Sequence, residues 1–292
     1  MLTRRRKEDE RRNWKELNTD CLVMVLERVG MESLILDVPF VCKSWYRASL
    51  NPQCWKTLLF PVRLYDFHLY PRMTWPHKFI GRFMNVYQLQ KFSVEGFVKL
   101  IVTRSRRSCV NILLPSECTS ELLEFISNEC PALKALVLPF DLMIDEGKVI
   151  SKLVSKWKDL EQLHLGSTLF SFEEILTEVS LNCKNFNGLS VNGFVWNEEA
   201  STIATLLPKI KYLRLRMRAS VPCESLKIIR EGCKELVLLD AMEYCIGFQG
   251  KNEEIFKMAS HIETIDYDAE EDFYIEHITD YASDGSFDGA SD

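Results

Sequence analysis

Six segments between residues 130 and 267 share one pattern of apolar positions. Each has an apolar residue at its fourth and seventh places, and an apolar or small residue at its first and ninth. They begin at residues 130, 157, 183, 207, 233 and 259, in steps of 27, 26, 24, 26 and 26 residues. The pattern predicts short strands, and the fixed period predicts a repeat protein in which each unit adds one strand.

Stretches with apolar residues at helical spacing separate these strands. The predicted helices are 93–105, 120–130, 147–157, 173–183, 197–208 and 223–233. A unit of one strand and one helix cannot bury its apolar side alone, so neighbouring units must stack. Stacking places a parallel sheet on the inner curve and the helices outside it. The segment 110–115 predicts an imperfect earlier repeat.

The period and the Cys or Trp that opens most of these segments resemble the cysteine-containing subtype of the leucine-rich repeat. The resemblance implies an α/β fold, a short curved solenoid of about six or seven repeats. Its parallel strands would line the concave face, with the helices outside. It also implies that Cys130, Cys183 and Cys233 pack inside the solenoid.

The first sixty residues carry a different pattern. A helical stripe follows Asn18 and Thr19, either of which is a suitable N-cap, and ends at Gly30. The stripe consists of Leu22, Val25, Leu26 and Val29. Two shorter helices are predicted at 31–42 and 42–50. Three helices in about forty residues make a small core, which usually depends on a neighbour for stability.

This segment resembles an F-box. The matching residues are Leu17, Asp20, Leu22, Leu26, "VCKSW" at 41–45 and the closing Trp55, whereas Asn18 stands where the family usually has proline. With the repeats, the resemblance implies a substrate receptor of an SCF-type (cullin–RING) ubiquitin ligase. The F-box would dock on a Skp-type adaptor, and through it on the cullin, while the repeats hold a protein target. The chemistry would occur on other subunits, so the chain would not be an enzyme.

The cysteines favour packing over metal binding. Cys42 and Cys54 are twelve residues apart, and the sequence contains no Cys-x-x-Cys pair of the kind that structural zinc sites use. Cys42, Trp45 and Trp55 are therefore expected in the interior of the helical module, with Trp45 as its largest apolar contribution. No nucleophile, phosphate-binding loop or metal motif is present, so we predict no catalytic residue, cofactor or metal.

Charge and hydropathy argue against two classes of partner, nucleic acid and the membrane. The net charge of −6 argues against nucleic acid as a partner, and no apolar run is long enough to span a membrane. With ten cysteines expected to be reduced, the predicted location is the nucleus, the cytoplasm or both. Residues 1–12 are basic and 268–292 acidic, and both are expected to be disordered. The basic run alternatively suits nuclear import.

The predicted organisation is an F-box at 13–60, a packed connection with an imperfect first repeat at 61–103, and repeats at 104–267. Adaptor contacts are expected from spare apolar residues of the first helix and its entry. These are Leu17, Asn18, Asp20, Leu22, Val25 and Leu26, although a core position suits Leu26 equally well. Two alternatives stay open for the whole chain: a scaffold that binds the adaptor outside ubiquitination, and a small-molecule co-receptor.

Target contacts are expected on the concave face, where side chains alternate with the buried leucines. The candidates are His164, Ser190, Asn192, Arg214, Arg216, Arg218, Asp240 and Asp266. The arginines suit an acidic or phosphorylated target, because guanidinium groups match planar oxyanions. The alternative is a solvated face whose arginines pair with neighbouring acids such as Asp240.

Overall fold

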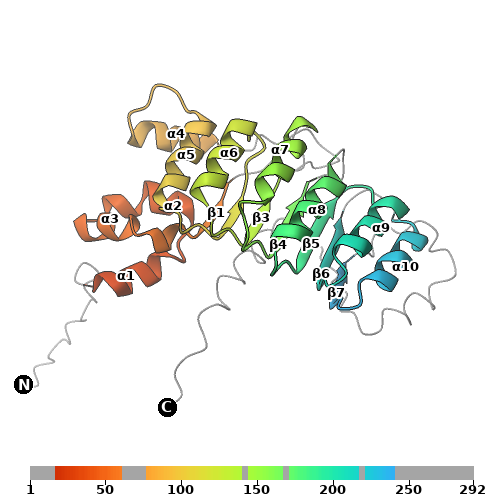
Figure 1. The fold of residues 1–292 in the computed structure, drawn as a ribbon. Coiled ribbons are helices and arrows are strands. Elements are labelled where there is room, and N and C mark those ends of the chain that lie inside the picture. Colours follow the sequence, from red (N-terminus) through yellow and green to blue (C-terminus); the bar gives the residue numbers. More distant parts are fainter. Residues whose placement is uncertain (1–16, 61–76, 140–143, 167–170, 217–220, 241–292) are drawn as a thin grey trace, which may run out of the picture.

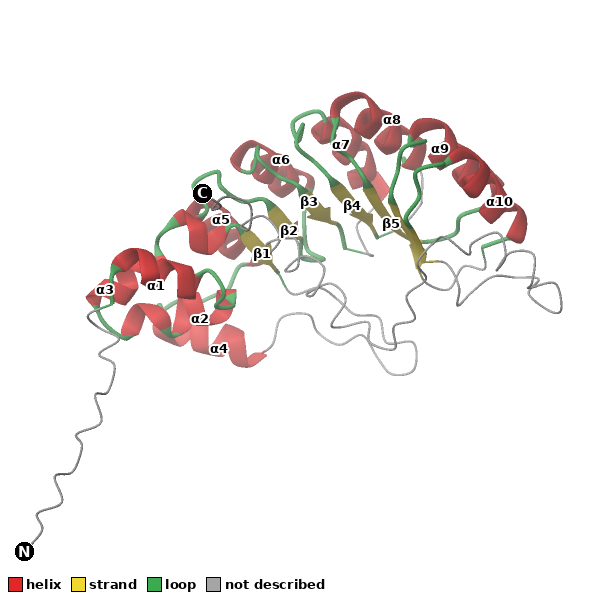
Figure 2. Cartoon of the chain, turned by 90° about the horizontal axis from the view of Figure 1, so that it is seen from below, coloured by secondary structure: helices red, strands yellow, loops and turns green. Residues whose placement is uncertain are grey.

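The computed structural model describes residues 17–60, 77–139, 144–166, 171–216 and 221–240. Its centre is one seven-stranded parallel sheet in which the strands follow chain order from β1 to β7. Helices cover the convex side of this sheet, and a helical module lies at its amino-terminal end (Figures 1 and 2). The described region is therefore a curved α/β solenoid with a helical module at one end, which confirms the predicted fold class.

Each strand is three to five residues long and pairs only with its neighbours in the sequence. Leu163, Leu189 and Leu213 stand opposite one another in the register of successive strands. The strands are β1 (Thr57–Leu59), β2 (Asn111–Leu113), β3 (Ala135–Val137), β4 (Gln162–Leu165), β5 (Gly188–Asn192), β6 (Tyr212–Arg216) and β7 (Leu238–Asp240). The segments predicted at 110–115 and from residue 130 to 241 thus contain strands, while 259–267 lies outside the described residues.

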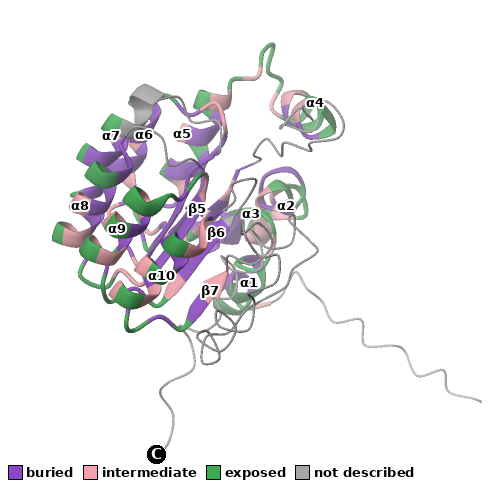
Figure 3. Ribbon diagram, turned by 90° about the vertical axis from the view of Figure 1, so that its right-hand side faces the viewer, coloured by how far each residue is buried: buried purple, intermediate pink, exposed green. Residues whose placement is uncertain are grey.

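The helices of the solenoid follow the predicted ranges closely. They are α5 (Val94–Arg104), α6 (Ser120–Glu129), α7 (Ile144–Val154), α8 (Phe172–Asn182), α9 (Asn197–Leu206) and α10 (Cys223–Gly232). The sides of these helices that face the sheet are buried and the outward sides exposed (Figure 3). Leu176, Val179 and Ile203, for example, are all 0 % exposed. Repetition of this apolar side is what makes the units stack.

A buried cysteine follows three of these helices and links successive repeats. Cys130, Cys183 and Cys233 are each buried, as the repeat resemblance implied. The thiol of Cys183 donates to the carbonyl of Trp157 at 3.4 Å, and that of Cys233 to the carbonyl of Leu207 at 3.8 Å. Burial raises the pKa of both thiols to about 11, so they remain protonated. They act as small interior donors.

The amino-terminal module contains three short helices and two turns of 3-10 helix. Its elements are α1 (Thr19–Leu26), α2 (Met31–Leu36), η2 (Val38–Phe40), α3 (Lys43–Ser49) and η3 (Pro52–Trp55). Asn18 caps α1, because its side-chain oxygen accepts from the N–H of Asp20 at 3.0 Å. Pro39 interrupts the second predicted helix by forcing the change from α2 to η2.

Trp55, and not Trp45, is the main aromatic residue of the module's interior. Trp55 is 0 % exposed, and its indole N–H donates to the carbonyl of Ser49 at 2.7 Å. Arg104 of α5 lies over its ring at 5.1 Å. Trp45 and Cys42 are only half-buried, so their predicted interior place is corrected. Trp45 lies on a helix that the small bundle covers from one side, whereas Trp55 lies between the module and α5.

The module and the solenoid share a strand, a helix and a core. The end of the segment predicted as F-box forms β1, which pairs with β2 of the solenoid. A further helix, α4 (His77–Val86), contacts α2 and buries Phe79 and Phe83 among Phe92 and Phe97. One continuous apolar core runs from α1 to the last described repeat.

Candidate protein-binding sites

The first candidate site is the outer surface of the amino-terminal module. Leu22 and Leu26 were predicted there, but each is only 1 % exposed and belongs to the core. The prediction that they offer surface is therefore corrected. The physical reason is the size of the module: helices this short must turn their most apolar positions inward to form a core at all. For Leu26 the core alternative is the correct one.

The other predicted adaptor residues lie nearer the surface. Leu17 is half-buried and packs against the core, whereas Asn18 and Asp20 are exposed at the start of α1. Val25 is 44 % exposed on the same helix. Of the predicted set, Asn18, Asp20 and Val25 therefore remain available to an outside protein.

Four exposed apolar residues of the module were missing from the prediction. Met24, Phe40, Val41 and Tyr46 are exposed by 59, 61, 47 and 49 %. They lie on α1, η2, the residue after η2, and α3, and the described contacts join α1 to α3 and α3 to η2. We call these four and Val25 the module surface. The signal that could have found them is their place between the positions of the α1 stripe and within "PFVCKSWY".

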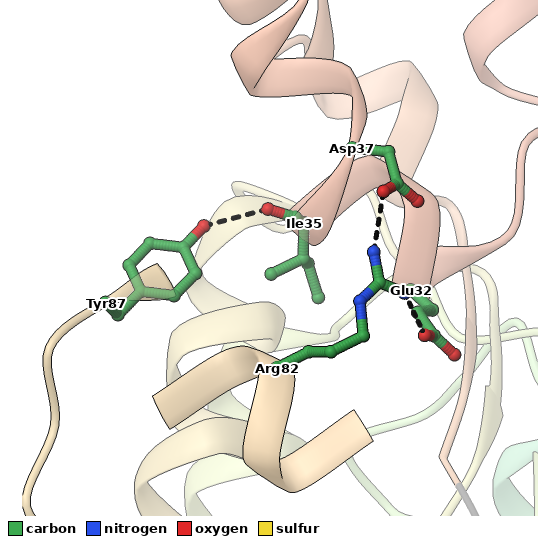
Figure 4. Close-up of polar contacts among 5 residues, drawn as sticks. All are labelled: Glu32, Ile35, Asp37, Arg82 and Tyr87. Atoms are coloured by element: carbon green, nitrogen blue, oxygen red, sulfur yellow. Dashed lines mark hydrogen bonds and ion pairs between the residues drawn. The ribbon is translucent and has the colours of Figure 1, made fainter. Parts of the chain in front are cut away.

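Polar contacts from α4 hold the inner side of the module (Figure 4). Arg82 spans two acids, with Nη1 at 2.8 Å from Glu32 Oε1 and Nη2 at 2.7 Å from Asp37 Oδ1. One turn further along, the hydroxyl of Tyr87 donates to the carbonyl of Ile35 at 3.0 Å. The chain between residues 77 and 87 therefore ties both ends of α2 to the helices of the solenoid.

The second candidate site is the concave face of the sheet. The register places His164, Ser190, Arg214 and Asp240 opposite one another on four successive strands. Asn192 lies in the next row, opposite Arg216. Arg218 and Asp266 lie outside the described residues. The structure thus brings four of the eight predicted target residues into one row.

Three residues of this row are buried and Asp240 is half-buried, so the row is neither a solvated face nor an exposed basic patch. The pairing of Arg214 with Asp240 stays a prediction. His164, Ser190 and Arg214 are exposed by 8, 6 and 7 %, so Arg214 is not part of a solvated face and does not present its charge to solvent. Strands lie about 4.8 Å apart, and side chains on the inner curve therefore crowd and shield one another. A buried guanidinium requires polar partners, so Arg214 is first of all a structural residue of the row.

Other features of the described residues add little chemistry. A depression of about 370 Å³ between α7 and α8 is lined by polar and charged side chains: Ser151, Lys152, Glu173, Glu174, Thr177 and Glu178. Small-molecule sites are enclosed and bury most of the ligand, whereas this depression is open to solvent. Within the described ranges, no cluster of three or more His, Cys, Asp or Glu suits a metal ion. None of the described helices has the length and apolarity to span a bilayer.

Comparison with known proteins gives a consistent family. The chain is 30 % identical over 231 residues to F-box/LRR-repeat protein At3g48880 of Arabidopsis thaliana, covering 78 % of this chain and 71 % of that protein. It is 27 % identical to putative F-box/LRR-repeat protein 23 of the same plant, covering 80 % of this chain and 49 % of that protein. It is 25 % identical to F-box protein FBW2, also from Arabidopsis, over 70 % of this chain and 60 % of that protein. No protein-family model matches.

Proposed function

Because this chain belongs to the F-box/leucine-rich-repeat family, a family of substrate adaptors, we propose that it is the substrate-recognition subunit of an SCF-type ubiquitin ligase. The module docks on a Skp-type adaptor, which attaches it to the cullin, and the solenoid binds a protein target. The chain acts in the nucleus or cytoplasm. It supplies proximity, which lowers the entropic cost of a reaction catalysed on other subunits.

The single observation on which the proposed adaptor docking rests is the exposed module surface. Exposed large apolar side chains gather on a short stretch of three contacting elements, while the core residues of the same helices are nearly inaccessible. Several exposed apolar side chains on contacting elements favour a protein-binding surface. Asn18 and Asp20 are exposed at the start of α1, the helix that also carries Met24 and Val25, which suits a polar rim around an apolar centre.

The joint at α4 supports the second half of the proposal. A substrate receptor must hold its target at a fixed distance from the reacting group, because misplacement costs effective concentration. The shared strand pairing of β1 with β2, the buried Phe79 and Phe83, and the Arg82 contacts join the two parts at three independent places. Such a joint transmits the position of the adaptor to the solenoid.

Two charged substitutions on the module surface test adaptor docking. In the double variant Val25→Asp with Phe40→Asp, each new carboxylate would lie within the proposed apolar interface. We expect adaptor affinity to fall by about thirtyfold or more, as when interface hot spots are removed. The measurement is titration of purified adaptor against the full chain, with circular dichroism to establish that the variant is folded.

The matched control is Leu181→Asp with Val237→Asp, at positions on the solenoid that are 61 and 46 % exposed. This variant carries the same added charge and should retain adaptor affinity. Unchanged adaptor binding by the Val25/Phe40 variant would contradict the proposal. Blotting the purified complex for cullin separates a ligase subunit from a scaffold that binds the adaptor alone.

A further inference from the structure

We propose that Phe194 and Trp196, on the turn between β5 and α9, form an aromatic platform that binds an arginine- or lysine-bearing segment of the target. This inference rests on the proposed function, because it names the chemistry of the substrate that the receptor holds. It places the recognition site at the edge of the solenoid, beside the buried row of the concave face.

The platform consists of two large aromatic side chains in solvent. Phe194 and Trp196 are 50 and 47 % exposed, in a repeat whose other large apolar residues are mostly buried. Their rings are parallel to within 3°, with centroids 6.0 Å apart. Tryptophan is among the residues that contribute most to protein interfaces. A stacked pair also offers a flat surface of the kind on which guanidinium groups lie.

The turn that carries the platform is firmly held. Between the two rings, Val195 is 0 % exposed and anchors the turn in the core. The N–H of Trp196 donates to Glu199 Oε2 at 2.8 Å, and its carbonyl accepts from the N–H of Ala200 at 2.9 Å. One residue on, the side-chain oxygen of Asn197 accepts from Ser225 of α10 at 2.8 Å. A rigid aromatic pair loses little conformational entropy on binding, which favours affinity.

The charges beside the platform select the partner. The first turns of α8, α9 and α10 carry Glu173, Glu174, Glu198, Glu199 and Glu224. Of these, Glu199 accepts from the N–H of Trp196, and Glu224 pairs with Lys227 at 3.3 Å. Glu198 lies two residues after Trp196 in α9 and is exposed. Aromatic faces attract cations, and carboxylates do so as well. The complementary ligand is therefore a cationic side chain on a flexible segment.

The test uses a hexa-arginine peptide as the probe and the full chain labelled with 5-fluorotryptophan. The chain has six tryptophans, and the Trp196 resonance is assigned by its loss in Trp196→Phe. We expect hexa-arginine to shift this resonance and hexaglutamate to leave it in place. Phe194→Ala with Trp196→Ala should weaken hexa-arginine binding by about fivefold, measured by fluorescence anisotropy of labelled peptide.

Matched variants separate the platform from general attraction of a cation to an acidic chain. Glu198→Gln with Glu224→Gln should weaken binding by about threefold. Glu231→Gln with Glu235→Gln should not, because Glu231 is near the end of α10 and Glu235 follows that helix. Leu181→Ala controls for loss of an exposed apolar side chain. A Trp196 resonance that hexa-arginine leaves unmoved, or that hexaglutamate moves equally, would overturn the proposal. Equal weakening by both glutamate pairs would overturn it as well.

Adaptor affinity is measured on the same preparations. Platform variants should bind the adaptor as the wild type does, because they leave the module surface unchanged. If the wild type binds hexa-arginine at Trp196 but does not bind the adaptor, the ligase proposal fails and the platform stands. If it binds the adaptor but fails the peptide test, the platform alone is wrong.

Discussion

The amino-terminal module and the solenoid differ in how completely they bury their apolar side chains. In the solenoid, Leu163, Leu189 and Leu213 repeat one inward position and are at most 2 % exposed. In the module, Met24 and Phe40 are exposed by 59 and 61 %, about as much as Leu181, the most exposed large apolar residue in the described part of the solenoid. A stack of repeats buries its apolar side against the next unit, whereas three short helices have too little interior for theirs. The smaller part therefore leaves apolar side chains exposed, and these form the surface that we propose binds the adaptor.

Exposure on the solenoid is correspondingly local. Phe194 and Trp196 are exposed on a turn held by Val195, while the repeat beneath them keeps its regular core. A regular core therefore leaves loops free to differ, and recognition residues concentrate there. The comparison predicts that changes in the core act on stability, and changes in these two exposed sets act on binding.

The largest expected effect is a loss of stability at high pH, because both parts contain buried thiols. Burial raises the pKa of Cys54 in the module, and of Cys183 and Cys233 in the solenoid, to about 11 from 9.0. Below pH 9 the thiols are protonated in both states. Between pH 9 and 11 the unfolded chain releases protons that the folded chain retains, so the free energy of unfolding falls. We expect about 2–3 kcal/mol per thiol, measured by urea denaturation at several pH values.

Replacing the buried cysteines by alanine measures how much the module and the solenoid each contribute to this loss of stability at high pH. Cys183→Ala with Cys233→Ala should remove part of the share of the solenoid and reduce the slope of unfolding free energy against pH. The rest of that share stays with Cys109, whose thiol pKa burial also raises. Cys54→Ala should remove the smaller share of the module. A slope that is the same in wild type and in all variants would show that these thiols do not titrate differently in the folded and unfolded states.

The second effect is a steric one between α9 and α10. A Cβ added at Gly232 would lie 2.3 Å from Ala204 Cβ and 3.0 Å from Ala204 Cα. Gly232→Ala should therefore lower the free energy of unfolding by about 1–3 kcal/mol, because the backbone of α9 must shift. Ala204→Gly in the same chain should recover part of this loss, as a double-mutant cycle would measure.

The matched control is Gly81→Ala in α4, at the joint with the module. A Cβ there would have nothing within 4 Å, so the substitution should stabilise the chain by about 0.5–1 kcal/mol through helix propensity. Equal effects at Gly81 and Gly232 would show that the close helix contact is not what requires glycine in the solenoid.

The smallest effect on stability is expected from a substitution at Arg82 of α4, where the module meets the solenoid. It is also the most informative for function. Arg82 and its partners Glu32 and Asp37 are about half exposed, so Arg82→Ala should cost at most about 1 kcal/mol. It should nevertheless broaden the distribution of distances between the two parts. Single-molecule energy transfer between dyes at positions 43 and 181 would measure this, using genetically encoded attachment sites. Lys99→Ala, which removes an ion pair within α5, should leave the distribution unchanged.

Much of the fold could be predicted from the sequence, because each repeat carries the same pattern of apolar residues. The helices predicted at 120–130, 173–183 and 223–233 match α6, α8 and α10 to within one residue at each end. β1 escaped prediction because Thr57–Leu59 is a three-residue strand directly after the F-box pattern. Helix α4 was predicted only as part of a packed connection, although Phe79, Ile80, Phe83 and Met84 follow helical spacing.

The binding surfaces were harder to predict, for physical reasons. A helical stripe such as Leu22, Val25 and Leu26 shows that a helix has an apolar side, but not how far that side extends past the core. Only packing shows that Val25 faces solvent while its two neighbours do not. Similarly, alternation placed Arg214 on the concave face correctly, but burial there depends on how closely the rows lie.

The pairing of β1 with β2 limits how the chain can change in evolution. The first strand of the sheet is supplied by the segment that also completes the amino-terminal module. Deleting that segment would remove β1 and make β2 the terminal strand, and the free peptide groups of a newly exposed edge favour aggregation. Repeats at the far end can be gained or lost one by one, whereas loss of the module would also remove part of the sheet.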